Sequence, residues 1–135
     1  MVVLDSSFLV AYHNSRDAHH TAAATVMERI VTGELGSALL PEYVFLELVT
    51  VLLARRGLES ASTAAATLLQ AREVEFVPCS DFFLETFETF RTQRDGGLSF
   101  ADAAIVTVAR RRDARFVATF DRDFRSVRGL EIVPG

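Results

Sequence analysis

Apolar positions along the chain fall into short continuous runs and into longer segments with helical spacing. Short runs rich in β-branched residues and bounded by turn residues predict buried strands. Longer segments with an apolar residue at every third or fourth position predict helices. The first expected strand begins at Val2, and the others cover 37–40, 73–78, 115–119 and 130–133. The expected helices cover 8–12, 17–31, 42–55, 58–71, the segment after Ser80, and 99–112.

Strands and helices alternate from end to end, with no repeat, linker or low-complexity tract. Such alternation predicts a mainly parallel sheet with helices on both faces. We therefore expect a single domain over residues 1–135 with a three-layer α/β/α fold of about five strands. No Gly-x-Gly-x-x-Gly motif follows the first strand, which argues against a dinucleotide-binding enzyme.

Composition narrows the range of functions. The chain is 50% hydrophobic and 24% charged, which is ordinary for a globular domain. No apolar run approaches the ~18 residues of a membrane span, and a strand at Val2 leaves no room for a secretory signal, so we expect a cytoplasmic protein without a membrane role. The single cysteine, Cys79, excludes an internal disulfide and a multi-cysteine zinc site.

All 14 basic residues are arginine, which excludes lysine-dependent chemistry such as Walker-type phosphate loops and Schiff bases. The net charge of −4 argues against a basic surface over the whole molecule. However, residues 110–128 hold seven arginines and only three aspartates. This strip can bind phosphates, or its first arginines can simply stabilise the end of a helix.

Four phenylalanines, Phe82, Phe83, Phe87 and Phe90, spread over more than one face of the helix expected after Ser80. Aromatic residues at this density usually pack inward. We therefore expect them in the hydrophobic core rather than on a surface that stacks nucleobases.

Two aspartates follow predicted strands: Asp5 ends the first, and Asp121 follows the fourth. Ligands of open α/β sheets bind beyond the carboxyl ends of the strands. If the first and fourth strands are neighbours, these carboxylates converge. Helix capping is the alternative role for Asp5.

Glu47 is the only ionisable group in the apolar segment 43–53, which predicts a helix buried nearly all round. An unpaired buried carboxylate costs several kcal/mol, so we expect Glu47 to be neutral, paired with an arginine, or bound to a cation. Asp102 follows Ser99 with the spacing of a capping box, and it opens a helix that must pack on the sheet.

Four carboxylates in one cleft repel one another unless some are protonated or a divalent cation neutralises them. Mg²⁺ and Mn²⁺ prefer such oxygen ligands, and they activate water and stabilise the charge of an in-line phosphoryl displacement. The residues alone therefore predict an acidic metal pocket in an α/β domain.

The ordered set of motifs resembles the PIN-domain nucleases, and the length resembles the stand-alone VapC-type toxins of toxin–antitoxin pairs. The matching features are the strand ending Val-Leu-Asp-Ser-Ser at Ser7, Glu47 inside an apolar helix, Leu-Ser-Phe-Ala-Asp-Ala ending at Ala103, and Ala-Thr-Phe-Asp-Arg-Asp-Phe ending at Phe124. The resemblance covers the whole chain. It implies a Mg²⁺- or Mn²⁺-dependent endoribonuclease that is usually dimeric and is held inactive by a small antitoxin.

By motif position, the resemblance assigns the catalytic and metal-binding roles to four acids: Asp5, Glu47, Asp102 and Asp121. We expect Asp5 and Asp102 to be the main metal ligands, with the other two completing or positioning the shell. It gives supporting positions to Ser6, Thr119 and Asp123. The implied reaction leaves a 5′-phosphate and a 3′-hydroxyl. Candidate arginines for the flanking phosphates are Arg112, Arg122 and Arg125.

Three other functions remain compatible with the sequence. The first is a metal-dependent phosphoesterase acting on DNA or a small phosphate compound, because similar carboxylate clusters serve those substrates. The second is a non-catalytic PIN-like module that binds a regulatory peptide. The third treats every acid as a cap or a salt bridge, which explains Asp5, Asp102 and Asp121 singly but not Glu47.

Overall fold

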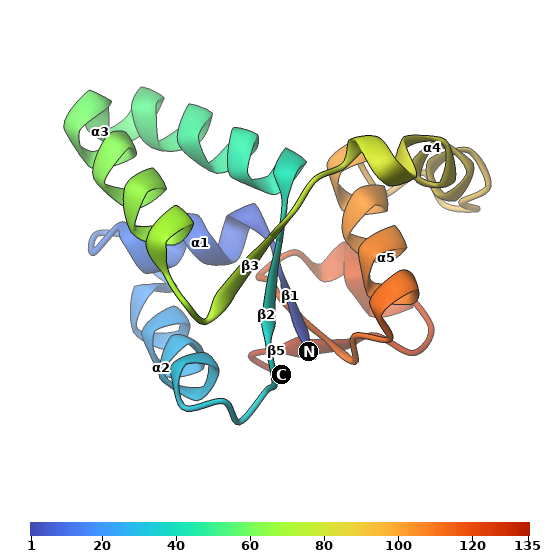
Figure 1. The fold of residues 1–135 in the computed structure, drawn as a ribbon, viewed down its shortest axis with the longest axis horizontal. Coiled ribbons are helices and arrows are strands. Elements are labelled where there is room, and N and C mark those ends of the chain that lie inside the picture. The colour runs from blue at the N-terminus through green and yellow to red at the C-terminus, as the bar shows by residue number, and fades with distance from the viewer.

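A computed structural model describes residues 1–135 as a five-stranded sheet with helices on both faces (Figure 1). In chain order the elements are β1 (Val2–Leu4), α1 (Ser6–His13), α2 (His20–Val31), β2 (Ala38–Pro41), α3 (Glu42–Gln70), β3 (Val74–Val77), the 3-10 helix η1 (Ser80–Phe82), α4 (Phe83–Arg91), α5 (Phe100–Arg112), β4 (Phe116–Ala118), the 3-10 helix η2 (Arg122–Ser126) and β5 (Glu131–Val133). The strand order is β3-β2-β1-β4-β5, and every pair is parallel. The predicted fold class and strand number are confirmed.

The strand β1 lies at the centre of the sheet, between β2 and β4. Its three residues are fully buried, as expected for a parallel strand covered on both faces. The register pairs Leu4 with Ala118, and the backbone N–H of Asp5 donates to the carbonyl oxygen of Ala118 at 3.0 Å. The first and fourth strands are therefore neighbours, and the residues that follow them meet at one edge of the sheet.

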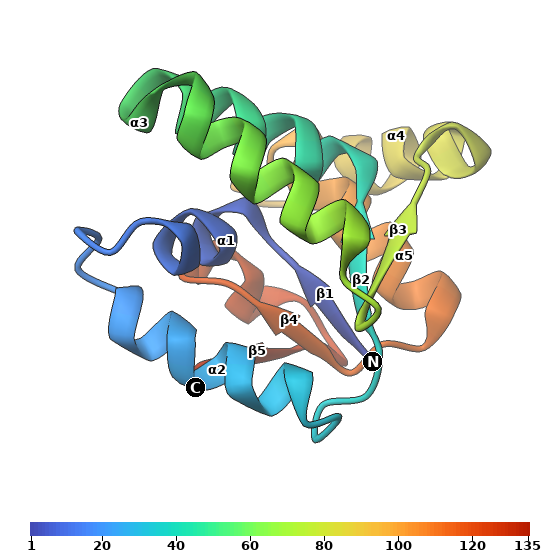
Figure 2. The same ribbon diagram turned by 60° about the vertical axis from the view of Figure 1, so that its left-hand side comes forward.

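The helices form two outer layers. In Figures 1 and 2, α1, α2 and α3 lie on one side of the sheet, and α5 with α4 lies on the other. The core between them is built from large aliphatic and aromatic side chains that are fully buried, such as Phe8, Leu39 and Ile105. None of the helices combines the length and the apolar content needed to cross a bilayer.

The long segment α3 consists of two helical arms that meet at Gly57 (Figure 2). Gly57 has φ 89° and ψ 174°, a backbone region open essentially only to glycine. The predicted end of a helix at this glycine is therefore confirmed, and the next helix starts without an intervening loop.

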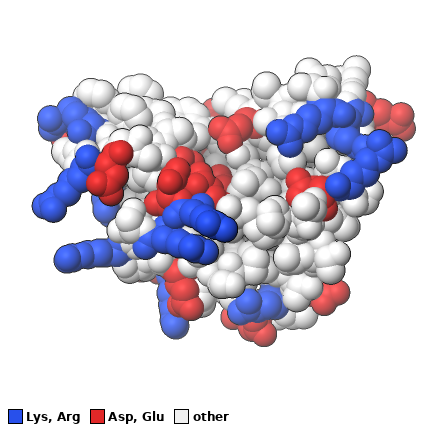
Figure 3. Space-filling model, turned by 180° about the vertical axis from the view of Figure 1, so that it is seen from behind, with Lys and Arg blue, Asp and Glu red and all other residues white.

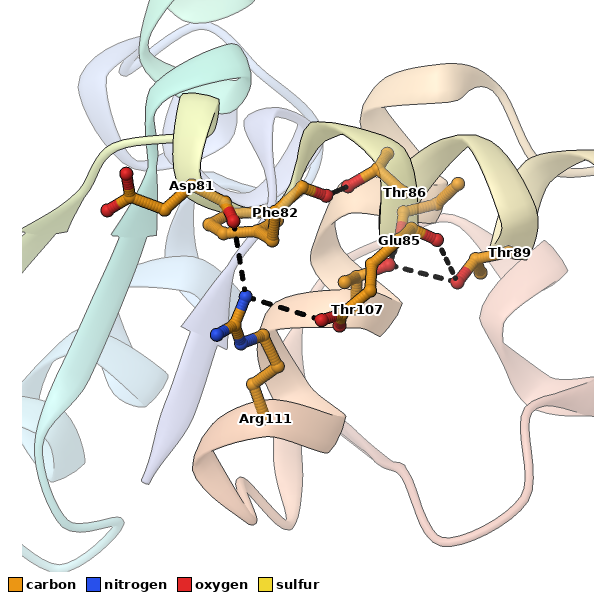
Figure 4. Close-up of polar contacts among 8 residues, drawn as sticks. Asp81, Phe82, Glu85, Thr86, Thr89, Thr107 and Arg111 are labelled. Carbon is orange, nitrogen blue, oxygen red and sulfur yellow. Dashed lines mark hydrogen bonds and ion pairs between the residues drawn. The ribbon is translucent and has the colours of Figure 1, made fainter.

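The α4 phenylalanines correct one prediction. Phe82 is buried, but Phe83, Phe87 and Phe90 are 49%, 45% and 38% exposed. Threonines lie at the centre of the contact with α5: Thr86 is fully buried, and the hydroxyl groups of Thr89 and Thr107 lie 3.0 Å apart (Figure 4). Phe83 and Phe90 contact α5 at its first residue, with ring centres 5.6 and 5.7 Å from that of Phe100. Because small polar side chains occupy the contact face, the large aromatic ones are left at its margins.

Arg111 of α5 fixes the start of α4 (Figure 4). Its guanidinium lies 3.4 Å from the Glu85 carboxylate and 3.5 Å from the backbone carbonyl oxygen of Asp81, and it lies over the ring of Phe82, 5.8 Å from the ring centre. This arginine is thus occupied by structural contacts between two helices.

Candidate active site

Asp5 follows β1 and is 5% exposed. It occupies the N-cap position of α1, yet its side chain makes no capping hydrogen bond. Its carboxylate instead accepts hydrogen bonds from the hydroxyl groups of Thr119 at 2.6 Å and Ser7 at 2.8 Å. The capping alternative therefore does not describe the contacts of this side chain.

Burial raises the pKa of the Asp5 carboxyl group above its ordinary value, and the negative charge of Glu47 raises it further. The hydrogen bonds from Thr119 and Ser7 act in the opposite direction. No arginine or histidine forms an ion pair with Asp5, because the five ion pairs of the structure involve other acids. Asp5 is thus a buried acid with no cationic partner, and its charged form is stabilised by the hydroxyl groups of Thr119 and Ser7 and by the backbone of Ser6.

Glu47 lies on the first arm of α3 and is exposed, so the prediction that it is buried is wrong. The outer face of this arm has no cover: Leu46 and Leu53 are 53% and 49% exposed. Glu47 has no arginine partner, and its carboxylate accepts a hydrogen bond from the hydroxyl group of Ser6, the residue after Asp5. This contact brings Glu47 to the same edge of the sheet as Asp5.

Asp102 forms the predicted capping box with Ser99. The Ser99 N–H donates to the Asp102 Oδ2 at 3.0 Å, and the Asp102 N–H donates to the Ser99 Oγ at 3.1 Å. Burial raises the Asp102 pKa from 3.8 to about 6, and the charges of Asp5 and Asp121 contribute to the rise. Asp102 therefore lies within electrostatic range of both strand-end aspartates.

Asp121 follows β4 and is half-buried. Its N–H donates to the Thr119 Oγ1 at 2.9 Å, and its own carboxylate accepts the N–H of Asp123 at 2.9 Å to cap η2. Asp123 itself is exposed. The capping contact orients Asp121 and leaves Asp123 at the surface.

Ser7 was not singled out from the sequence, although it connects both sides of the site. Its hydroxyl donates to Asp5 and accepts the N–H of Phe120 at 3.0 Å. A hydroxyl residue two positions after a strand-end aspartate is the only signal that could have identified it, and serine is also common at helix starts.

Comparisons with known proteins identify the family. The model of the PIN domain matches residues 2–130. The chain belongs to the PIN-domain family. Among solved structures, the toxin VapC20 of Mycobacterium tuberculosis, described as a sarcin-ricin loop cleaving toxin, superposes with a TM-score of 0.82. It is 26% identical in sequence over 95% of both chains. No curated protein matched the sequence.

PIN nucleases use divalent metal ions, and the acidic edge of this PIN domain has the donor chemistry for one. Its side-chain donors are carboxylate and hydroxyl oxygens, and none of the carboxylates is neutralised by an arginine. Hard divalent cations prefer such oxygens. As the side chains lie, no three of the His, Cys, Asp and Glu groups form a cluster that could enclose an ion. Ion binding would therefore require the carboxylates to turn toward one another.

The arginine candidates for phosphate binding separate into two kinds. Arg112 forms two hydrogen bonds with the Glu75 carboxylate, at 2.6 and 2.8 Å, so it already has an acidic partner. Arg122 and Arg125 form no ion pair and are exposed. On the face behind the view of Figure 1, arginines flank an acidic patch (Figure 3).

Proposed function

We propose that this PIN domain is a divalent-metal-dependent endoribonuclease and the toxin of a toxin–antitoxin pair. The observation that carries the proposal is the meeting of the acids at one edge of the sheet, where Thr119 bonds both Asp5 and Asp121 and Ser6 bonds Glu47. Several carboxylates near one another without a basic partner suit a cation-dependent phosphodiesterase. The similarity to a sarcin-ricin loop cleaving toxin supports RNA as the substrate.

In this proposal, Asp5 and Asp102 are the main ligands of Mg²⁺ or Mn²⁺, and Glu47 and Asp121 complete or position the ligand shell. Ser6 and Thr119 support it by orienting Glu47 and Asp5 through the hydrogen bonds described above. Asp123 supports it through its contact with Asp121.

When bound, the ion would lower the pKa of an attacking water and offset the charge of the phosphate in the transition state. The protein's own contribution is orientation. Hydroxyl groups of Thr119 and Ser7 hold the Asp5 carboxylate, and the Ser99 N–H holds Oδ2 of Asp102, which leaves its Oδ1 without a protein partner. Water adds to phosphorus as the bond to the 3′-oxygen breaks, so the products are a 5′-phosphate and a 3′-hydroxyl.

We propose a single cytoplasmic domain over residues 1–135 that binds a small antitoxin and forms a homodimer. The exposed leucines Leu46 and Leu53 on α3 support an apolar interface, because exposed apolar side chains on one helix face are typical of association surfaces. The molar mass of the purified chain in solution tests the homodimer. The molar mass after mixing with the product of the adjacent reading frame tests the antitoxin complex.

Cleavage of matched RNA and DNA strands tests the proposed activity. We expect the purified chain to cleave RNA, including a sarcin-ricin hairpin, with Mg²⁺ or Mn²⁺ and not with a chelator. Equal cleavage of the DNA strand would favour a general phosphoesterase. Cation binding without cleavage of any RNA would favour a non-catalytic module.

A further inference from the structure

A groove of about 770 Å³ lies beside the acidic edge, between the connection from α4 to α5, the helix α5 and the segment around η2. Five of its lining residues are arginines: Arg94, Arg110, Arg122, Arg125 and Arg128. Its acidic lining residues are Asp95 and Asp123. The groove therefore carries an excess of three positive charges in a protein whose net charge is −4.

None of the five arginines in the groove forms an ion pair. The protein has 14 arginines, and five of them form ion pairs elsewhere: Arg29, Arg91, Arg111, Arg112 and Arg115. Five of the nine remaining arginines line this one groove. Like charges gathered in a concave surface repel one another and concentrate the field, so such a surface favours an anionic ligand.

Both walls of the groove lead directly to carboxylates of the site. The first wall is the loop 93–98. The Gln93 side chain joins its two ends, because it donates to the carbonyl oxygen of Leu98 and accepts the Leu98 N–H, both at 2.9 Å. The next residue begins the capping box of Asp102. The second wall is η2, whose first turn is capped by Asp121. The groove thus has fixed walls that continue into the acidic edge.

The floor of the groove follows one side of α5. Asp102, Val106 and Arg110 are four residues apart, so they lie on the same face of the helix. At 1.5 Å per residue, Arg110 lies about 12 Å along the helix axis from Asp102. The arginines of the groove therefore include Arg122, which directly follows Asp121, and Arg110, which lies farther along α5.

Resting on the proposed function, we propose that this groove binds the phosphates of the single-stranded RNA next to the cleaved bond. Arginine guanidinium groups bind phosphate oxygens in pairs, and a basic groove follows the backbone of a single strand. The lining has no aromatic side chain on which a base could stack. The groove thus adds affinity for any sequence, and it offsets the repulsion between RNA and the carboxylates.

The test measures binding without cleavage. A labelled 12-nucleotide oligouridylate is titrated in chelator, at several salt concentrations, against two triple variants of equal charge. One carries Arg110→Gln, Arg125→Gln and Arg128→Gln. The control carries Arg16→Gln, Arg55→Gln and Arg56→Gln, which are exposed and unpaired but lie outside the groove. We expect the groove variant to lose at least tenfold in RNA affinity. The slope of its log affinity against log salt concentration should be smaller by about 2, since each phosphate contact contributes ~0.7. The RNA affinity of the control variant should change less than twofold.

Equal losses of RNA affinity in the two variants would overturn the proposal. So would a groove variant that loses more affinity for an RNA duplex than for a single strand of the same length. Unchanged RNA affinity with lost binding of polyglutamate would assign the groove to an acidic polypeptide and also overturn it. Cleavage separates this inference from the nuclease assignment. Wild-type protein that binds through the groove but cuts no RNA refutes only the nuclease. A groove variant that cuts long RNA with unchanged KM refutes only the groove.

Discussion

The hydroxyl of Thr119 connects the two strand ends of the site. It donates to the buried Asp5 carboxylate at 2.6 Å, and its oxygen accepts the N–H of Asp121 at 2.9 Å. Thr119 is 1% exposed, so water does not compete for either contact. One side chain therefore orients two of the proposed catalytic carboxylates.

Replacing Thr119 tests this connection. Thr119→Val leaves the Asp121 N–H without its acceptor and removes a hydrogen bond that lowers the pKa of Asp5. We expect a loss of about 1–3 kcal/mol in the free energy of unfolding and a ~10–100-fold loss in Mn²⁺ affinity. Urea denaturation and calorimetric titration measure the two effects. Thr119→Ser keeps the hydroxyl and is the control, and equal Mn²⁺ affinity of the two variants would contradict the role.

Asp5→Asn tests the central carboxylate. Asparagine has the same size and still accepts the hydrogen bond from Thr119, so the variant should fold with unchanged or higher stability. We expect metal-dependent RNA cleavage to fall at least ~100-fold, which corresponds to roughly 2.7 kcal/mol of transition-state stabilisation. Asp81→Asn, an exposed aspartate on η1, is the matched control. Undiminished cleavage by purified Asp5→Asn would refute the assignment.

Glu47→Gln separates function from stability. Because Glu47 is exposed, the change should alter the free energy of unfolding by less than about 0.5 kcal/mol. The same variant should lower RNA cleavage, because it removes a carboxylate charge next to Ser6 and Asp5. Thermal unfolding and cleavage rates are measured on one preparation. A large loss of stability would mean that Glu47 has a structural role.

The pKa of Asp102 predicts how stability depends on pH without metal. Between the ordinary value of 3.8 and about 6, the folded state binds more protons than the unfolded state at this group. The contribution of Asp102 to stability therefore falls as pH rises through this window. We expect Asp102→Asn to raise the melting temperature at pH 7.5 in chelator and to have little effect at pH 3.5.

Mn²⁺ should reverse the order of the melting temperatures of the wild type and Asp102→Asn at pH 7.5. An ion that binds only the folded protein raises the melting temperature of the wild type in proportion to the logarithm of its concentration, and Asp102→Asn should lose most of that rise. Identical Mn²⁺-dependent shifts in the two proteins would contradict the proposed ligand role.

Gly57 predicts a purely conformational effect. A methyl group at this position would meet nothing within 4 Å apart from its chain neighbours and the adjacent helix backbone, so the cost of Gly57→Ala is backbone strain. We expect a loss of about 1–3 kcal/mol in the free energy of unfolding. Ser62→Ala, on the exposed face of the second arm, should change it by less than about 0.5 kcal/mol. Equal changes of the free energy of unfolding for the two variants in urea denaturation would show that alanine is not strained at position 57.

The sequence predicted the elements well because strands buried on both faces and helices with one apolar face leave distinct patterns. It also located the residues at the strand ends, since Asp5 and Asp121 directly follow apolar runs. The exact neighbours could not be predicted. The contacts of Asp5 with Thr119 and Ser7 depend on the register between β1 and β4, which pairs residues 114 positions apart.

The wrong predictions share one physical cause. An apolar pattern shows that a side chain can be buried, but not which neighbour covers it. Glu47 touches Ser6 of α1 and Phe83 touches Phe100 of α5, but other elements cover these helix faces only in part, so both side chains are exposed. Likewise, nothing in the local sequence indicates that Glu75, 37 positions away, is the partner of Arg112.

The central position of β1 has a consequence for the order of synthesis. The strand that Asp5 follows is made well before its second neighbour, β4, which is made only after residue 115. A ribosome-bound chain of that length already contains Asp5, Glu47 and Asp102, yet one edge of β1 is unpaired and Thr119 is missing. The site can therefore form only after β4 and Thr119 have been made, so a chain truncated before residue 119 lacks both the second neighbour of β1 and the hydroxyl group that holds Asp5.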